Sequence, residues 1–422
     1  MKTLLRCAIA AAIALPAAAM AGSTAQVTSD NNDGAGSLRA ALASGATQIV
    51  INPSVGVITV TESLQYTGTE PLTLIGSGQT IDGAGMSNDL DPIFAVTQGA
   101  DLTIKRLSFT GSGSYSRSDN LNNGVEVSGG KGIYLNVPDT RTGTVKVNLS
   151  GVSVFDTGNH GIHVSDCSLG DDCGGGGGGA GDGSPASIEV NLNDVLVDGV
   201  GFGKQDADGV RVDDRNDGNI VFNVVNSTFR NVGADGVELD EGNQGSVIIN
   251  VVNTTFEGNG AYCVDGPFVA GDACDDEGDP DVDDGFDIDE AGPGDIRGKV
   301  VNTEVVNNFD EGLDFDEEDA GGYRLTLSNI YAENNEDEGV KISEENDGGI
   351  RVDLKVVTLL NNNGSKEDIE IEEADDGNVR ASIISSTIDE VKVEEDGTGF
   401  GILKIRSSNI AEELDLDNVE VK

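Results

Sequence analysis

The chain has 422 residues, with 75 acidic against 25 basic side chains and a formal net charge of −50. Proteins that follow a nucleic-acid backbone need a basic stripe, and no such stripe is apparent here, so a nucleic-acid partner is not expected. The chain has no Trp and only 4% aromatic residues, so an aromatic platform for stacking sugars is missing as well.

The first residues have the pattern of a secretory signal peptide. Lys2 and Arg6 give a basic start, an apolar stretch runs from Ala8 to Ala19, and Ala19-Met20-Ala21 supplies the small residues of a cleavage site. We therefore expect residues 1–21 to be removed and the mature chain, 22–422, to be secreted or periplasmic. No later stretch approaches the roughly 18 consecutive apolar residues of a membrane span, so no membrane span is expected.

From about residue 205 onward, one short sequence motif recurs, which we call the acidic phrase. It consists of an acidic residue, a Gly, two apolar residues flanking a variable one, and two further polar, mostly acidic residues. Three steps between successive glycines are equal, since 236 − 209 = 312 − 285 = 339 − 312 = 27 residues. A fixed period of this length is typical of a solenoid, and the alternation of apolar with polar residues predicts half-buried strands. The full copies are Asp208–Asp214, Asp235–Glu241, Asp284–Glu290, Glu311–Glu317 and Glu338–Glu344.

The N-terminal part of the mature chain adds a second set of signals. Gly36 to Leu42 predicts a helical turn, and the apolar runs Ile49–Ile51 and Leu72–Ile75 precede Ile81-Asp82-Gly83. This N-terminal segment and the repeats, each of which would form one rung of a solenoid, together resemble the right-handed parallel β-helix (pectin-lyase-like) superfamily of secreted bacterial proteins. The resemblance implies an all-β fold: a single right-handed parallel β-helix solenoid with a short N-terminal helical cap over the first strand edge. It implies little about function, because this superfamily includes lyases, polygalacturonases, epimerases and adhesins.

Four cysteines remain after removal of the signal peptide, and they form two close pairs in the sequence. Cys167 lies near Cys173, and Cys263 lies near Cys274, in two insertions between rungs at about 165–185 and 260–283. In an exported chain this spacing predicts two local disulfides that close loops. A metal site is the alternative, which an oxidising compartment disfavours.

The acidic residues are concentrated in the second half of the chain. Residues 1–200 carry 9 basic and 19 acidic side chains, whereas residues 201–422 carry 16 and 56. Neighbouring parallel strands lie about 4.8 Å apart, so equivalent carboxylates form columns in which neighbours repel by roughly 1 kcal/mol in water. Protonation or hard cations would relieve this repulsion; cations are favoured in an exterior rich in divalent ions, and all-oxygen ligands favour Ca²⁺. A solvated acidic face is the alternative.

We therefore predict that several Ca²⁺ or similar cations bind along the rungs. The segment from Asp279 to Glu290 has acidic residues at positions 1, 3, 5, 9 and 12 of a calcium-loop register, although Asp284 stands where that motif has Gly. The predicted metal ligands are Asp213, Asp214, Asp235, Asp240, Glu241, Asp279, Asp281, Asp283, Asp284, Asp287, Asp289, Glu290, Glu311, Asp314, Asp316 and Glu317.

A Ca²⁺-dependent polysaccharide lyase is the alternative function. In β-helix lyases of acidic polysaccharides, Ca²⁺ neutralises a uronate while an Arg or Lys removes its α-proton. Arg211 and Lys341 have acidic neighbours and are the candidate bases; otherwise they only relieve repulsion within their column. That column is predicted to contain Arg211, Glu238, Asp287, Asp314, Lys341, Glu370, Lys392 and Asp415.

Other polar residues are interpreted as structural. His160 and His163, the only histidines, are expected at the surface or in a turn, with catalysis or metal binding as the alternative. Asn residues that recur at the rung period are expected to satisfy backbone groups at the rung corners. These Asn columns are Asn226, Asn253, Asn302 and Asn329, and Asn231, Asn259, Asn308 and Asn335.

The sequence as a whole predicts an exported Ca²⁺-binding β-helix protein that acts as a surface or extracellular-matrix interaction module. Its expected partners are divalent cations and an extracellular polysaccharide or a cell-surface component. The rungs repeat without a singular site, so the sequence leaves open whether the protein is an enzyme.

Overall fold

The computed structural model describes residues 22–86, 91–112, 130–166, 183–263, 283–362, 367–412 and 414–422. The predicted signal peptide, Cys167, Cys173, Cys274, Asp279 and Asp281 lie outside these ranges, so what the sequence predicts for them stays a prediction. Cys263 is buried at the start of the second insertion.

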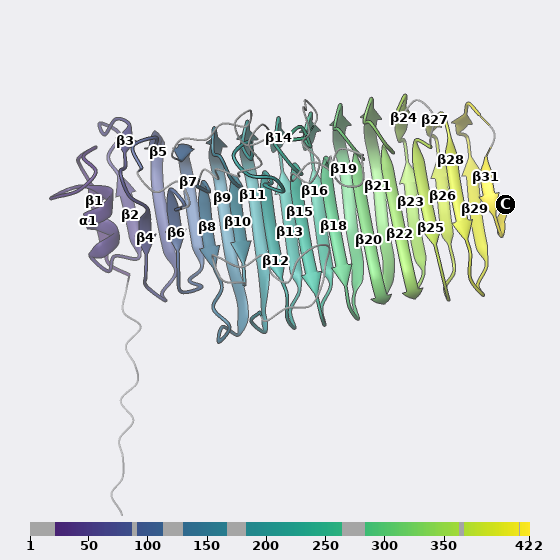
Figure 1. Cartoon of the computed structure of the whole chain (residues 1–422), viewed down its shortest axis with the longest axis horizontal. Helices are drawn as coiled ribbons and strands as arrows, with labels where there is room; N and C mark the ends of the chain where they lie inside the picture. Colours follow the sequence, from purple (N-terminus) through teal and green to yellow (C-terminus); the bar gives the residue numbers. More distant parts are fainter. Residues whose placement is uncertain are drawn as a thin grey trace, which may run out of the picture.

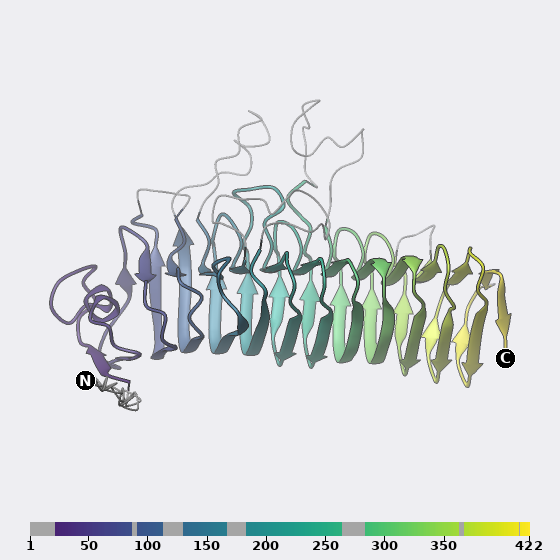
Figure 2. The same cartoon turned by 90° about the horizontal axis from the view of Figure 1, so that it is seen from below.

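Every strand pairing that the structure describes is parallel, and the strands form two long sheets. Figures 1 and 2 show the rungs side by side in chain order, from purple at the N-terminal end to yellow at the C-terminal end. The chain is therefore an all-β parallel β-helix solenoid, as the resemblance predicts.

The 12-stranded sheet consists of β4 (Leu64–Tyr66), β6 (Phe94–Val96), β8 (Ile133–Asn136), β10 (Ile162–Ser165), β12 (Val210–Asp214), β15 (Val237–Gly242), β18 (Phe286–Ala291), β20 (Leu313–Ala320), β22 (Val340–Asp347), β25 (Ile369–Glu373), β28 (Val391–Glu395) and β31 (Asp415–Asp417). The 20-stranded sheet consists of β1 (Thr24–Val27), β2 (Gln48–Ile51), β3 (Ile58–Thr59), β5 (Leu72–Gly83), β7 (Leu102–Ser112), β9 (Gly143–Phe155), β11 (Ala186–Asp198), β13 (Ile220–Val225), β14 (Thr228–Arg230), β16 (Val247–Val252), β17 (Thr255–Glu257), β19 (Asp295–Val306), β21 (Gly322–Glu333), β23 (Ile350–Lys355), β24 (Thr358–Leu360), β26 (Arg380–Ile384), β27 (Thr387–Ile388), β29 (Gly401–Arg406), β30 (Asn409–Ile410) and β32 (Val419–Val421).

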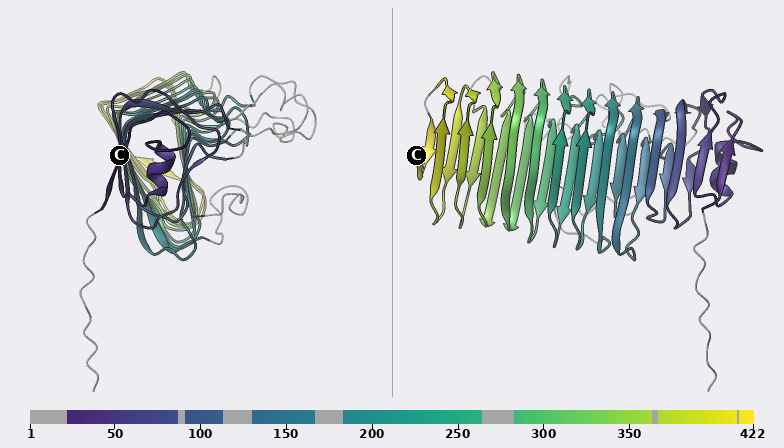
Figure 3. Two further views of the ribbon diagram at one scale, coloured as in Figure 1. Left: turned by 90° about the vertical axis from the view of Figure 1, so that its left-hand side faces the viewer. Right: turned by 180° about the vertical axis from the view of Figure 1, so that it is seen from behind.

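One rung consists of three short strands joined by tight corners, which together outline the cross-section seen along the solenoid (Figure 3, left). In the rung that begins with β12, Asn226 forms the corner between β13 and β14 with φ = 54°. Asn tolerates this left-handed conformation better than most residues. Asn253 takes the same corner in the next rung, and its Nδ2 donates to Asn226 Oδ1 at 3.0 Å. Asn302 and Asn329 continue the column, which is structural as predicted.

A second amide column lies inside the solenoid. Asn259, Asn308 and Asn335 are at most 2% exposed. Each Nδ2 donates to the Oδ1 of the residue one rung further on, at 2.8 or 2.9 Å, and the column continues to Asn362. The Nδ2 of Asn362 donates to Asp368 Oδ1 at 2.8 Å, so the column ends on a carboxylate.

The prediction that Asn231 belongs to this interior column is wrong. Its spacing to Asn259 is 259 − 231 = 28 residues, one more than the rung period, so Asn231 falls one position earlier in its rung. Its side chain is exposed and donates to Asp198 Oδ1 at 2.8 Å. The buried Val232 lies beside Asn259 instead and donates its backbone N–H to Asn259 Oδ1.

The N-terminal end of the solenoid is covered by α1 (Leu38–Ala43), which lies across the stack (Figure 3, left). Ser37 caps the helix, because its Oγ accepts a hydrogen bond from Ala40 N at 3.1 Å. Leu38, Ala41 and Leu42 are buried against the first strands. The predicted helical cap is therefore confirmed. Within the described ranges, no helix has the length and apolar character needed to cross a membrane.

Aromatic rings fill the middle of the core as a stack. Phe229, Phe256, Phe286 and Phe315 are fully buried, and their successive ring centroids lie 5.4, 5.4 and 5.3 Å apart. Each inner ring therefore contacts the rings of the rungs before and after it, which ties neighbouring rungs together.

Replacing Phe286 with Ala is expected to lower the free energy of unfolding by about 3–5 kcal/mol, because the change leaves a cavity in a close-packed interior. Denaturant unfolding measures this loss. The matched control is Phe400→Ala, whose ring is 46% exposed and whose removal is expected to cost far less. Equal losses in the two variants would contradict the role of the stack.

Candidate metal centre

The 12-stranded sheet presents alternate side chains to its outer surface and to the core. In β18, Phe286, Ile288 and Glu290 are fully buried on the core side, whereas Asp287 and Asp289 lie on the outer side and are partly exposed. The acidic phrase therefore supplies two separate sets of carboxylates. On the outer side, the strand register confirms the predicted column of Arg211, Glu238, Asp287, Asp314, Lys341, Glu370, Lys392 and Asp415.

The last acidic residue of each phrase points into the solenoid. We call these residues the interior ladder, since they pair in register from rung to rung and their side chains are completely buried. They are Asp214, Glu241, Glu290, Glu317, Glu344 and Glu373. The predicted ligands Asp214, Glu241, Glu290 and Glu317 thus lie on the opposite side of the sheet from those predicted ligands that point outward on the described strands, such as Asp287 and Asp314.

Space for the interior ladder comes from a Gly four residues after each acidic residue. A Cβ at Gly245 would lie 1.9 Å from Glu241 Oε1, and a Cβ at Gly294 would lie 2.2 Å from Glu290 Oε1. Such distances are far below van der Waals contact, so the missing side chain makes room for the carboxyl group. The acidic residue and its Gly therefore form one structural unit of the rung.

Burial raises the pKa of every residue in the interior ladder. It raises the pKa of Asp214 to about 9, with a further contribution from the carboxylate of Asp166. The pKa of Glu290 rises above those of Glu241 and Glu317, because burial is joined by hydrogen bonding and repulsion from both neighbours. As carboxylates, these groups have no hydrogen-bond donor within reach, except that Glu373 Oε1 accepts from Asp375 N at 3.3 Å. The interior ladder therefore requires shared protons or bound cations.

On the outer surface, carboxylates of two neighbouring rungs converge around Asp284. One oxygen each from Asp284, Asp287 and Asp314 lies within 4.8 Å of the other two, and the same holds for Asp284, Asp310 and Glu311. We call these five residues the Asp284 centre. They are hard oxygen ligands of the kind that Ca²⁺ prefers, so this group could hold a metal ion.

The Asp284 centre contains buried oxygens without a protein partner. Asp284 is 9% exposed and Asp314 is 7% exposed, and the Oδ1 atom of each lacks a hydrogen-bond partner. Burial, followed by repulsion from nearby acids, holds the pKa of Asp284 and of Asp287 well above the usual range. A buried carboxylate with a free oxygen is costly unless a proton or a cation neutralises it.

Basic side chains neutralise part of this centre and the acidic groups beside it. Within the centre, Lys341 Nζ lies 2.7 Å from Asp314 Oδ2 and 3.3 Å from Glu311 Oε1. Beside the centre, Arg215 lies 2.5 Å from Asp240 Oδ2. Arg211 forms ion pairs with Asp206, Asp208, Asp213, Glu238 and Asp240. Asp284 and Asp287 have no such ion pair with any residue that the structure describes, so their part of the surface has the strongest need for a cation.

Arg211 and Lys341, the candidate bases of the alternative function, hold their protons firmly. Burial alone would lower the pKa of each, but the surrounding carboxylates outweigh it and raise the pKa above its ordinary value. Glu238 contributes most around Arg211, and Asp314 contributes most around Lys341. The carboxylates around Arg211 and Lys341 therefore favour the other role considered for both residues, which is to relieve repulsion within the outer column.

The predicted calcium loop from Asp279 to Glu290 divides between the two sides of the sheet. Asp287 lies on the outer side of β18 and Glu290 on the core side, so one ion cannot take both as ligands. Strand alternation separates residues that a loop would bring together. Asp283 directly precedes the Asp284 centre, and Asp235 supports it by accepting a hydrogen bond from Asp284 N at 2.6 Å.

A second polar cluster lies at the N-terminal end of the acidic columns. His160 and His163 are only 4% and 7% exposed, so the expected surface position is wrong for both. His160 lies in the turn between β9 and β10, which the prediction allowed, whereas His163 lies within β10. His163 Nε2 lies 2.6 Å from Asp213 Oδ2, and His163 Nδ1 lies 2.5 Å from Lys131 Nζ. The Tyr134 ring is centred 5.4 Å from that of His163. We call Lys131, Tyr134, His160, His163 and Asp213 the histidine cluster.

Burial sets the charges within the histidine cluster. It lowers the pKa of His163 to about 4 and that of Lys131 to about 7. A neutral His163 that donates from Nε2 to Asp213 keeps Nδ1 as an acceptor for Lys131. The repeat register could have revealed this site, because His163 pairs with Arg211 in the outer column.

No known protein-family model matches this chain, and no curated protein matches it. Among solved structures, it is similar to ORF18 of Geobacillus virus E2, at 11% identity and a TM-score of 0.48 over 94% of this chain and 61% of that chain. The GH136 lacto-N-biosidase from Eubacterium ramulus is 10% identical, with a TM-score of 0.47 over 89% and 62%. The A-module of the Azotobacter vinelandii mannuronan C-5 epimerase AlgE6 is 11% identical, with a TM-score of 0.44 over 91% and 94%. The chain spans less than two thirds of the first two proteins, and its fold assignment rests on its own strand pairing.

Proposed function

We propose that this protein is an exported β-helix protein that binds Ca²⁺ or a similar hard cation at the Asp284 centre and acts as a surface or extracellular-matrix interaction module. The predicted signal peptide, residues 1–21, would direct its export. The observation that carries the proposal is the buried Asp284 centre, in which Asp284 and Asp314 each have an oxygen without a hydrogen-bond partner.

The arrangement explains what a cation would do for the fold. Ca²⁺ accepts six to eight oxygen ligands in a flexible geometry, so carboxylates from two rungs and water can share it. Asp284 and Asp287 belong to one rung and Asp314 to the next, and the mutual repulsion of their carboxylates opposes the pairing of the two rungs. A bound cation replaces that repulsion with attraction and links β18 to β20.

Calcium titration of the chelator-treated mature chain, residues 22–422, tests the proposal. Calorimetry is expected to give saturable binding, and the melting temperature is expected to rise with Ca²⁺, because a ligand that binds only the folded state stabilises it. Absence of binding at millimolar Ca²⁺, with a stability that follows only bulk salt, would contradict the proposal.

Substitution of two ligands locates the binding. In Asp287→Asn/Asp314→Asn, calcium affinity at the centre is expected to fall on the order of 10- to 100-fold, because two carboxylates become neutral amides. The matched control is Asp319→Asn/Asp347→Asn, which removes two exposed charges from β20 and β22. Equal affinity loss in both double variants would point to general electrostatics rather than to this centre.

A lyase that acts on a uronate polymer is the second candidate, and the histidine cluster favours it. A lyase needs one place where a base and charged groups converge, and this cluster is such a place among the described rungs. Because the pKa of Lys131 is lowered to about 7, its amine is partly deprotonated at neutral pH and suited to general base catalysis. Arg211, which pairs with Asp213, lies beside it.

Incubation of the calcium-loaded protein with uronate polymers tests this candidate. A lyase releases unsaturated sugar products, which are followed by their ultraviolet absorbance. We expect Lys131→Met to abolish release, and Lys146→Met, which removes an exposed lysine paired with Glu189, to leave it intact. No product from any uronate polymer would exclude the lyase and leave the cation-binding proposal standing.

A further inference from the structure

A column of four arginines lies on the outer side of the 20-stranded sheet. Arg297, Arg324, Arg351 and Arg380 pair in register on β19, β21, β23 and β26. The expectation that the chain has no basic stripe is therefore wrong. The residues recur with the rungs, since 324 − 297 = 351 − 324 = 27, so they never form a basic run in the sequence.

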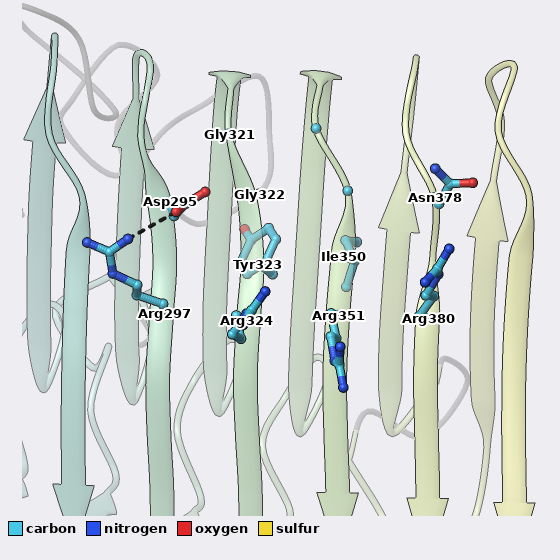
Figure 4. Close-up of a pocket in the computed structure, with 12 residues that line it drawn as sticks. Asp295, Arg297, Gly321, Gly322, Tyr323, Arg324, Ile350, Arg351, Asn378 and Arg380 are labelled. Carbon is cyan, nitrogen blue, oxygen red and sulfur yellow. Dashed lines mark hydrogen bonds and ion pairs between the residues drawn. The ribbon is translucent and has the colours of Figure 1, made fainter.

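The arginines are open to solvent and poorly neutralised. Arg297 is 43% exposed and pairs with Asp295 at 3.1 Å, while Arg324, Arg351 and Arg380 are exposed. Within the described ranges, no acidic side chain forms an ion pair with Arg324 or Arg351. Figure 4 shows the four side chains along successive strands.

The arginine column lies in a long groove. One cavity of about 600 Å³ contains all four arginines, and a second of about 540 Å³ continues from Arg351 and Arg380 toward Phe400. Further basic side chains lie on the same outer face. With the column, they make eight of the 16 basic residues of 201–422; these additional residues are Lys299, Lys355, Lys404 and Arg406. We call this surface the arginine groove.

One arginine of the groove already has a carboxylate partner from the protein itself. Asp295, two residues before Arg297, places a carboxylate beside that guanidinium. The residues in register with Asp295 are Gly322 and Gly349, which have no side chain. The positions equivalent to Asp295 beside Arg324 and Arg351 therefore carry no carboxylate. The acidic residue on the strand of Arg351 is Asp353, which interacts electrostatically with Arg351 and pairs with Lys355 at 3.5 Å.

We propose that the arginine groove binds a linear, carboxylate-bearing polysaccharide, whose carboxylates take beside Arg324 and Arg351 the place that Asp295 takes beside Arg297. The planar guanidinium fork matches a carboxylate with two parallel hydrogen bonds. Neighbouring strands lie about 4.8 Å apart, which is close to the advance of a glycan chain per sugar, so one acidic sugar can face each rung.

The lining of the groove argues for a glycan over a single-stranded nucleic acid. Proteins that bind single strands combine a basic groove with aromatic platforms for the bases. Phe400 is the one exposed aromatic ring among the residues that line the two cavities, and Arg380 already lies 5.5 Å from its centroid. Tyr323 is buried, so it offers no stacking surface.

Binding of an oligogalacturonate of defined length tests the proposal, with chelator present so that no divalent cation can bridge the sugar to the acidic columns. Fluorescence polarisation at low salt is expected to report saturable binding that weakens as salt rises. A fully methyl-esterified oligomer, which lacks the carboxylate charge, is expected not to bind. Because cations are removed, the result is independent of whether the Asp284 centre binds Ca²⁺.

Arg324→Gln/Arg351→Gln is expected to weaken oligogalacturonate binding about 10- to 100-fold, because two charge-assisted contacts are lost. Lys146→Gln/Arg230→Gln, which removes two exposed positive charges elsewhere, is expected to leave binding unchanged. Gly349→Asp retains every arginine but supplies Arg351 with an internal carboxylate, and is expected to weaken binding too.

Several results would overturn the proposal. These are unchanged binding by Arg324→Gln/Arg351→Gln, equal binding of the methyl-esterified oligomer, and tighter binding of a single-stranded polynucleotide than of the oligogalacturonate. Circular dichroism and the melting temperature of each variant establish that it is folded, so a loss of binding is assigned to the groove.

Discussion

In the presence of chelator, the folded protein is expected to lose several kcal/mol of stability between pH 6.5 and pH 9. Burial raises the pKa of Asp214 and of Glu344 to about 9 in the folded state, well above their ordinary values of 3.8 and 4.5. The folded protein therefore retains protons that the unfolded chain has released, and stability falls as pH rises through the folded pKa values. One unit of pKa difference in one group corresponds to about 1.4 kcal/mol, and the Asp284 centre adds further groups of the same sign.

The other buried titratable groups do not reverse this loss of stability with rising pH. The pKa of Lys131 is lowered to about 7, so this one residue adds stability as pH rises, against many carboxyl groups that remove it. His160 and His163 have pKa values below the ordinary 6.5, so they destabilise the fold only at lower pH. Thermal unfolding across this range measures the effect, and Ca²⁺ is expected to reduce it. A flat profile in chelator would show that the carboxyl groups are already neutralised in another way.

Replacing alternate members of the interior ladder is expected to stabilise the cation-free protein. In Glu290→Gln/Glu344→Gln, neutral amides replace the two glutamates whose pKa values their neighbours raise. Each amide can donate to the adjoining carboxylates of Glu241, Glu317 and Glu373. The first two have no donor of their own, and Glu373 has one, Asp375 N. At pH 9 in chelator, the free energy of unfolding is expected to rise by about 2–4 kcal/mol, and the pH dependence is expected to flatten.

The same double variant separates the two ways of neutralising the interior ladder. If protons neutralise the interior ladder, the free energies of unfolding of the variant and the wild type differ little near pH 4.5, because the ladder is uncharged in both proteins. If cations hold it, the variant loses part of the rise in melting temperature that Ca²⁺ produces. Glu304→Gln is the matched control, because this side chain is exposed on the outer surface. A variant less stable than the wild type at pH 9 in chelator would contradict the expectation.

Most of the fold follows from the repeat. The equal glycine steps predict the rungs, and the alternation predicts strands. The pairing of Arg211 with Glu238, and of Glu238 with Asp287, follows once the repeats are aligned. The helix that Ser37 caps can also be predicted from the sequence, because a capping Ser precedes an apolar run. These features depend on local chemistry and on one period.

The candidate sites were less predictable, because they depend on which way each side chain points and on what surrounds it. An Asp-Glu pair such as Asp289-Glu290 reads as one acidic patch, yet strand alternation sends one residue outward and the other into the core. The burial of His163 requires neighbouring rungs that no local pattern contains. The arginine column is not apparent in the sequence, because each arginine is isolated among strand residues and the four come together only through the strand register.

The two amide columns run in opposite directions along the solenoid. At the corner, Asn253 donates back to Asn226, whereas inside, Asn259 donates forward to Asn308. Aligned amides polarise one another and sum to a dipole, so two columns of opposite sense largely cancel along the axis. The forward column delivers its positive end to the carboxylate of Asp368. Insertion or loss of a whole rung preserves both directions, so the solenoid can change length without reversing a single hydrogen bond.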